Sequence, residues 1–157
     1  MSRRDTILDA LVAALGASTA GAHAKPAGLN VHRHRTMPLA QDQLPAQVVY
    51  ALAEEVKTGP ARGLDDKRLA RRYLQLCVEH RVNAGSSTPD QAIDPLLSWA
   101  VRAVCRLPEL GGLTHDIQEL GTTWDQAEED TVLASAKTVF LVEYVTSASD
   151  PAAATAG

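Results

Sequence analysis

The sequence is poor in aromatic residues and in cysteines. Among its 157 residues there are 2 Trp, 3 Tyr and 1 Phe, so we expect a core built mainly from Leu, Val and Ala. Cys77 and Cys105 form no Cys-x-x-Cys pair, and two thiols cannot build a disulfide framework. This cysteine usage favours a reduced, cytoplasmic setting in which both residues are structural.

Long apolar runs and excess positive charge are also missing. No segment approaches the ~20 apolar residues that a membrane-spanning helix needs. The apolar stretch after Arg3 and Arg4 is interrupted by Asp5 and Asp9, which is typical of an ordinary helix rather than of a signal peptide. The net charge of -4 argues against sequence-independent DNA binding, which depends on neutralising phosphates. Mild acidity would suit a surface that DNA passes without sticking.

Two periodicities dominate the middle of the chain. Apolar residues alternate with polar ones from Leu69 to Val82, which predicts a half-buried strand. After a breaker at residues 83–87, apolar residues recur at three- and four-residue steps, which predicts a helix. Its start has two candidates, because Thr88-Pro89-Asp90-Gln91 is a capping box while Pro95 favours Asp94 as the cap. We slightly prefer Asp94 for the regular part.

The other elements follow from the same patterns. A helix capped by Ser2 ends near Gly16, and residues 17–28 read as a flexible linker. Strands are predicted at residues 29–35, 46–55, around 117–120 and at 132–146, and the apolar faces of 46–55 indicate a central strand covered on both sides. The order predicts an α+β fold: a mostly antiparallel sheet of about five strands with two helices packed on one face. Residues 1–147 would form this single domain and residues 148–157 a flexible tail.

The sequence contains no clear catalytic motif. His32 and His34 lie on one face of a strand and could hold a metal, but no third ligand has suitable spacing, so a solvated or partner-facing strand is preferred. Cys77 and His80 should point to opposite faces of their strand, which disfavours a nucleophile–base pair. We therefore predict no catalytic, metal or cofactor site.

Charged segments supply the candidate contacts with partners. Three arginines near residue 70 form a dense basic cluster, either an exposed strand end or a docking surface for an acidic neighbour. The acidic segment 124–130 lacks the spacing of a calcium loop and reads as an exposed hairpin tip, and the loop 56–67 would be a second protrusion. The predicted interaction residues are Arg68, Arg71, Arg72, Arg81, Trp124, Asp125, Glu128, Glu129 and Asp130.

Several phrases carry a family resemblance over roughly residues 5 to 146. They are RDTILDALVAAL, MPLAQDQLPAQVVYALAEEV, RRYLQLCVEHRV, DQAIDPLLSWAVRAV, LGGLTHDIQELGTTWD and KTVFLVEYVT. In this order they resemble the tail terminator (minor tail protein U-like, tail completion) proteins of long-tailed bacteriophages. Pro95 and the long linker at 17–28 depart from the family pattern, so the start of the second helix stays open.

The resemblance implies a non-enzymatic virion protein. Such subunits form a homohexameric ring that caps the tail tube, ends its polymerisation and joins the tail to the head. The implied partners are further copies of the chain, the major tail tube protein, the head–tail connector or neck protein, and DNA passing through the lumen without sequence-specific binding. The implied location is the head–tail junction of the virion, after assembly in the host cytoplasm.

Two alternatives remain. The chain could be another neck or head-completion protein of the same kind of particle. It could also be a small ligand-binding or enzymatic bacterial α+β domain, which would require a pocket of convergent polar groups, for instance around His32, His34 and His80.

Overall fold

The structure is a computed structural model that describes residues 1–34, 41–59, 68–106, 110–125 and 133–152. Its helices are α1 (Arg3–Gly16) and α2 (Pro89–Cys105). The strands of the main sheet are β3 (Asn30–Arg33), β4 (Ala46–Thr58), β5 (Leu69–Asn83), β6 (Asp116–Trp124) and β7 (Leu133–Ser147). A small hairpin, β1 (Thr19–Ala20) with β2 (His23–Ala24), and short 3-10 turns at Gln41–Gln43 and Leu110–Gly112 complete it.

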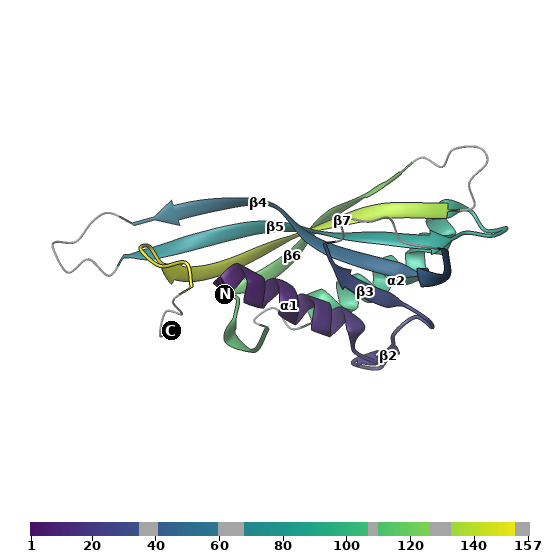
Figure 1. Cartoon of the computed structure of the whole chain (residues 1–157), viewed down its shortest axis with the longest axis horizontal. Helices are drawn as coiled ribbons and strands as arrows, with labels where there is room; N and C mark the ends of the chain where they lie inside the picture. The colour runs from purple at the N-terminus through teal and green to yellow at the C-terminus, as the bar shows by residue number, and fades with distance from the viewer. Residues whose placement is uncertain (35–40, 60–67, 107–109, 126–132, 153–157) are drawn as a thin grey trace.

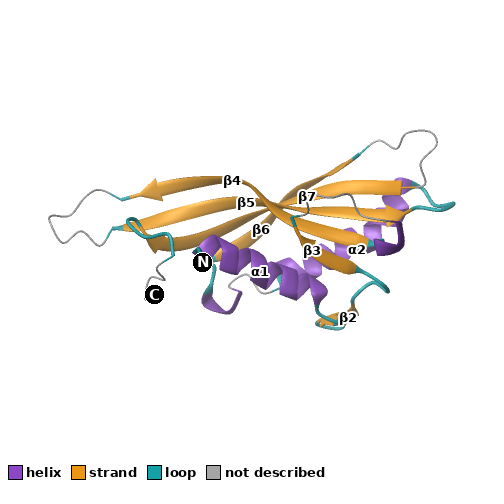
Figure 2. Ribbon diagram, in the orientation of Figure 1, coloured by secondary structure: helices purple, strands orange, loops and turns teal. Residues whose placement is uncertain are grey.

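The main sheet has the order β3-β4-β5-β7-β6, and both helices lie on one of its faces (Figures 1 and 2). The neighbouring pairs β4–β5, β5–β7 and β7–β6 are antiparallel. The predicted α+β fold is therefore confirmed. The first pair departs from the expected run of hairpins, because β3 lies parallel to β4 with Asn30 opposite Ala46.

The core lies between the sheet and the two helices. Leu76 of β5 faces Phe140 of β7 in the register, and both side chains are fully buried. Trp99 of α2 is 2% exposed, and its indole N–H donates to the carbonyl of Leu15 in α1 at 2.9 Å. Burying such side chains contributes ~2–3 kcal/mol each. The predicted packing of both helices on one face of the sheet is thus confirmed.

Helix α2 begins earlier than we preferred. Thr88 is its N-cap, Pro89 is its first residue and Pro95 lies inside it, so the choice of Asp94 as the cap was wrong. A proline within the second turn removes one main-chain hydrogen bond. The fully buried Ile93 and the 3%-exposed Leu96 on either side of Pro95 hold this part of the helix by packing.

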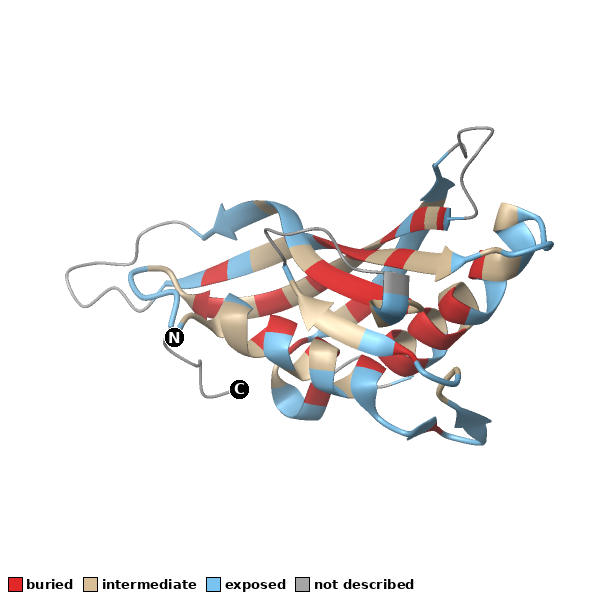
Figure 3. Ribbon diagram, turned by 45° about the vertical axis from the view of Figure 1, so that its right-hand side comes forward, coloured by how far each residue is buried: buried red, intermediate tan, exposed pale blue. Residues whose placement is uncertain are grey.

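Strand β4 is covered only along its first part. Residues Ala46 to Val49, which pair with β3, are buried, whereas the rest of the strand to Thr58 is half-buried or exposed (Figure 3). The prediction of a central strand covered on both sides was wrong for this second part. The reason is that β3 has only four residues, so β4 becomes an edge strand beyond it.

Residues 17–28 are more than a linker. They contain the β1–β2 hairpin, with Gly21 at a φ of 64° in its turn. Ala20 is 6% exposed and joins the core with Leu29, so the flexible-linker prediction was wrong here.

The first residues of the predicted tail lie beside α1. Ala148 N–H donates to the Arg68 carbonyl at 2.9 Å, and Arg3 N–H donates to the Pro151 carbonyl at 3.3 Å. The remaining tail residues, 153–157, lie outside the described part of the chain.

A directed chain of hydrogen bonds crosses the core at His80. The Gln47 amide nitrogen lies 3.0 Å from the Leu96 carbonyl and 3.1 Å from His80 Nδ1. Because the amide donates to both, Nδ1 accepts, and Nε2–H donates to Thr138 Oγ1 at 2.8 Å. Thr138 lies 2.9 Å from Thr122 Oγ1, to which its hydroxyl can donate. Burial lowers the pKa of His80 to about 4, so a neutral imidazole links α2 to four strands.

Candidate interaction surface

The sheet face opposite the helices, hereafter the helix-free face, has no helix on it in the described residues (Figure 2). Its side chains come from alternate positions of β4, β5, β6 and β7, and most of those on the inner strands are half-buried rather than buried (Figure 3). Apolar, aromatic and charged groups are mixed on it, as in many protein interfaces. They include Tyr50, Tyr73, Gln75, Cys77, Glu79, Arg81, Val139, Leu141, Glu143 and Val145.

The middle of this face is uncharged. Tyr50 and Cys77 lie opposite each other in the β4–β5 register, and burial raises the pKa of both side chains. Cys77 is 1% exposed, so its thiol is neither ionised nor accessible enough to act as a nucleophile. The ring of His34 meets Tyr50 edge-on, with centroids 6.0 Å apart.

A first depression, of about 410 Å³, lies where β4 and β5 extend beyond the helices. Its walls include Glu55, Lys57, Tyr73 and Leu141. The Lys57 ammonium sits 5.3 Å from the centroid of the Tyr73 ring and 3.8 Å from the Glu55 carboxylate. An exposed cation–π contact is worth ~0.5–1 kcal/mol, which a partner's groups could replace.

A second depression, of about 310 Å³, lies near the other end of the sheet. It brings together Arg81 and Asp125, two of the residues predicted to contact partners, with Leu44 and Leu133 beside them. The Arg81 guanidinium lies 3.1 Å from Glu79, and Asp125 accepts a hydrogen bond from Ser135 at 2.8 Å. Charged and apolar groups at one opening suit contact with another protein.

The predicted arginine cluster is divided by the sheet. Arg71 is on the helix-free face, with 62% of its side chain exposed and the Glu143 carboxylate 3.5 Å away. Arg72 faces the helices, with 14% of its side chain exposed. The main-chain carbonyl of Arg68 accepts from Ala148. Neighbouring residues of a strand point to opposite faces, so the three cations do not form one patch.

Arg72 belongs to a polar cluster inside the subunit. It donates to Glu54 at 2.8 Å and to Thr146 at 2.9 Å. Tyr144 also donates to Glu54, at 2.6 Å, and Arg4 of α1 lies 3.8 Å from the same carboxylate. This cluster fastens the projecting parts of β4 and β5 to α1 and β7.

Of the remaining predicted contact residues, Trp124 ends β6 and Asp125 follows it. Trp124 is 45% exposed, and Asp125 lies at the second depression. Glu128, Glu129 and Asp130 lie outside the described residues, so their contacts stay a prediction.

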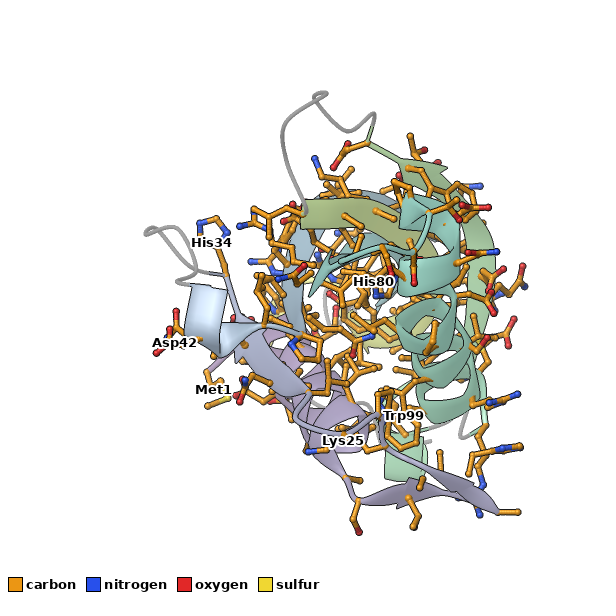
Figure 4. The ribbon with its side chains drawn as sticks, turned by 90° about the vertical axis from the view of Figure 1, so that its right-hand side faces the viewer. Met1, Lys25, His34, Asp42, His80 and Trp99 are labelled. Atoms are coloured by element: carbon orange, nitrogen blue, oxygen red, sulfur yellow. The ribbon has the colours of Figure 1, made fainter. Side chains whose placement is uncertain are left out.

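The histidines do not gather at one pocket. His32 pairs with Val48 on the helix-free face, and His34 lies on the same side against Tyr50. His80 is between the sheet and α2, on the other side (Figure 4). Within the described ranges, no group of three or more His, Cys, Asp or Glu side chains could hold a metal ion. No helix of the described chain is long and apolar enough to cross a membrane.

Two leucines at the edges of the sheet were missed by sequence reasoning. Each is the extra residue of a β-bulge: Leu52 between Ala51 and Ala53, and Leu120 between Glu119 and Gly121. Leu52 is 51% exposed and Leu120 is 50% exposed. The glycine inside a strand pattern was an available signal for the second bulge. The first bulge has no such signal in the sequence.

Comparison with known proteins gives little further identification. No protein-family model matches the chain, and no curated protein matches it. Its structure is similar to a chain in a solved structure described as the virion of a native gene transfer agent (GTA) particle. The two share 14% sequence identity with a TM-score of 0.36, covering 87% of this chain and 84% of that one. At this identity and score the likeness assigns no function.

Proposed function

We propose that this chain is a structural subunit of a phage-like virion, a tail terminator that forms a homo-oligomeric ring at the end of the tail tube. The ring would stop tube growth and present the surface that joins the tail to the head connector. The observation that carries the proposal is a sheet whose core is complete on one face while the other face and both edges are left for neighbours. The sequence phrases that resemble tail terminators support it.

The division of the sheet favours assembly over catalysis. The helices bury the apolar side chains of β5 and β7 on their own face, so the subunit needs no partner to complete that core. The helix-free face keeps half-buried apolar groups and two depressions. Exposed apolar residues at sheet edges are sites for pairing with another chain.

The charge of the chain is compatible with a ring through which DNA moves. With a net charge of -4, the subunit would repel phosphates on average rather than hold them. DNA could then leave through the lumen without being retained.

Tube-assembly reactions test the proposal. Purified protein added to polymerising tail tube protein should halt elongation, and negative-stain images should show rings at tube ends. Tubes of unchanged length with bare ends would contradict it. Attachment to purified head connectors but never to tubes would instead assign the chain to the neck.

A further inference from the structure

We infer that Gln47, His80 and the carbonyl of Leu96 form an acid-sensitive latch between α2 and the sheet. When His80 takes up a proton, the side-chain amide of Gln47 turns over and releases Leu96, while the strands stay joined. This inference concerns the single subunit and does not depend on the proposed ring.

The Gln47 amide is held in one orientation by its two acceptors. Its nitrogen lies 3.0 Å from the Leu96 carbonyl and 3.1 Å from His80 Nδ1. A carbonyl oxygen can only accept, so the end of the amide that faces Leu96 must be the NH2 group. One N–H then donates to Leu96 and the other to Nδ1, which has to be unprotonated.

The other end of the same amide lacks a donor. Gln47 is fully buried, and its Oε1 has no hydrogen-bond partner among the described residues. Most buried side-chain polar atoms have such a partner. The present orientation therefore satisfies Leu96 and His80 but not the amide oxygen, and a proton on Nδ1 would supply the donor that this oxygen lacks.

Protonation of His80 is incompatible with the present orientation. An imidazolium carries a hydrogen on both ring nitrogens, so Nδ1–H would meet the amide N–H across 3.1 Å, donor against donor. Half a turn of the amide instead brings Oε1 to accept from Nδ1–H. The same turn sets this oxygen against the Leu96 carbonyl, acceptor against acceptor, and the link to α2 is lost.

The links between the strands do not change with protonation. Nε2 carries its hydrogen in both states of the ring and lies 2.8 Å from Thr138 Oγ1. Thr138 in turn lies 2.9 Å from Thr122 Oγ1. The connection from β5 through β7 to β6 therefore survives in acid, and the latch opens only on the side of the helix (Figure 4).

The latch acts on the part of α2 that is least supported by its own main chain. Pro95 has no N–H to donate to the carbonyl of Gln91, so the first turns lack one helical hydrogen bond. Ile93 and Leu96 are buried beneath these turns, and Gln47 adds a hydrogen bond from the sheet at Leu96. Loss of that bond should loosen the first half of α2 before the strands.

No charged side chain faces His80 in the described part of the chain. Glu79 and Arg81 flank it on β5 and point to the helix-free face, as does Lys137 of β7 opposite Glu79. Glu119 of β6 and the charged residues of α2 are exposed. The groups that surround the ring are uncharged: Gln47, Leu96, Thr122 and Thr138. Burial is accordingly the cause that lowers the pKa of His80.

Nuclear magnetic resonance of the full wild-type chain follows the latch between about pH 7 and about pH 4. At neutral pH the His80 ring should carry its hydrogen on Nε2. As the ring titrates, the side-chain NH2 signals of Gln47 should shift with the same midpoint. Amide exchange, corrected for the pH dependence of the intrinsic rate, should quicken by up to about tenfold in the first half of α2, because one hydrogen bond is lost. It should change much less in β5 and β7.

Two variants separate the latch from general unfolding in acid. His80→Gln does not titrate, so exchange in α2 should show no acid step. Gln47→Met keeps the length of the side chain without its donor, so the first half of α2 should exchange at the faster rate at both pH values.

Four results would overturn the inference. A ring hydrogen on Nδ1 at neutral pH would reverse the direction of the hydrogen bonds. Unshifted Gln47 signals during the titration of His80 would show that the amide does not turn. An acid step that persists in His80→Gln would place the sensor elsewhere. Equal loss of protection in α2, β5 and β7 would mean that acid acts on the whole fold.

Discussion

The two faces of the sheet differ in how completely their side chains are buried. Toward the helices, Leu74, Leu76 and Phe140 are buried and His80 takes part in a directed hydrogen-bond chain. On the helix-free face, aromatic and charged groups are only half-covered, around two depressions. Packing that holds the subunit together is therefore concentrated on the helix-facing side, and the helix-free face is left only partly covered.

The ion pairs of the two faces differ in the same way. The exposed pair Arg71–Glu143 at 3.5 Å contributes ~0–1 kcal/mol, because water and salt screen it. The Arg72–Glu54 pair is mostly covered, and its members also bond to Thr146 and Tyr144. Replacing either partner therefore disturbs other contacts inside the subunit.

The largest effect should come from placing a charge in the helix-facing core. Leu96→Asp removes a side chain that is 3% exposed and buries an unpaired carboxylate, at a cost of about 5 kcal/mol or more. This approaches the whole stability of a typical domain, so thermal unfolding should find little folded protein.

The matched variant is Leu52→Asp, at a side chain that is 51% exposed. It should unfold at the wild-type temperature and fail to form rings. A stable, folded Leu96→Asp protein would remove the distinction between the two faces.

Acid should weaken the subunit through His80. Its pKa in the folded protein is about 4, below the ordinary 6.5, so the unfolded chain binds the proton more readily. The stability of the fold with a neutral His80 is fully present above pH 6.5. It is lost as the pH falls towards the pKa of His80 in the folded protein. That loss is about 3 kcal/mol at 1.36 kcal/mol per unit.

Urea unfolding of the wild type and of His80→Gln measures this effect. Glutamine keeps a polar group at the site but does not titrate, so the free energy of unfolding of the variant should fall less between about pH 7 and about pH 4. The carboxylates of the chain titrate in both proteins and so contribute equally to both curves. Parallel curves would mean that His80 is not held neutral by the fold.

Arg71 and Arg72 are neighbours on β5 and point to opposite faces of the sheet, so replacing each in turn compares the two faces. Arg72→Met should lower the free energy of unfolding by ~1–3 kcal/mol, because it removes two hydrogen bonds and leaves Glu54 with less compensation. Arg71→Met should change it by less than ~0.5 kcal/mol. Equal losses in chemical denaturation would show that both arginines are equally engaged.

The smallest effect on stability should come from the second depression. Arg81→Glu should stay within about 1 kcal/mol of the wild type, while weakening ring formation or attachment by charge reversal beside Glu79 and Asp125. The control is Arg102→Glu, on an exposed position of α2. Both variants are compared by native mass spectrometry, and equal assembly would exclude the depression as a contact.

Alternation and helical spacing were enough to predict the elements with strong periodic patterns. Strands β5 and β7 and the packing of α2 against the sheet follow from residues whose local preference agrees with the core. The same alternation also separates Arg71 from Arg72, since Arg72 shares a face with Leu74, although the sequence prediction grouped them as one cluster.

What could not be predicted depends on contacts between distant segments. The parallel pairing of β3 with β4 leaves no local signal, and it decides where β4 becomes an edge. Burial of Ile93 and Leu96 outweighs the cost of Pro95 within α2. The bulge at Leu52 depends on how β4 fits against β5, which the spacing of Ala51 and Ala53 does not reveal.

The central claim is that the helix-facing side holds the subunit together while the edges of the sheet meet neighbouring chains. Amide hydrogen exchange on the free and the assembled wild-type chain tests it most directly. Assembly should slow exchange in residues Ala51–Thr58 and in β6, with little change in α1 and α2. Protection gained on the helices, with both sheet edges exchanging as in the free chain, would contradict the account.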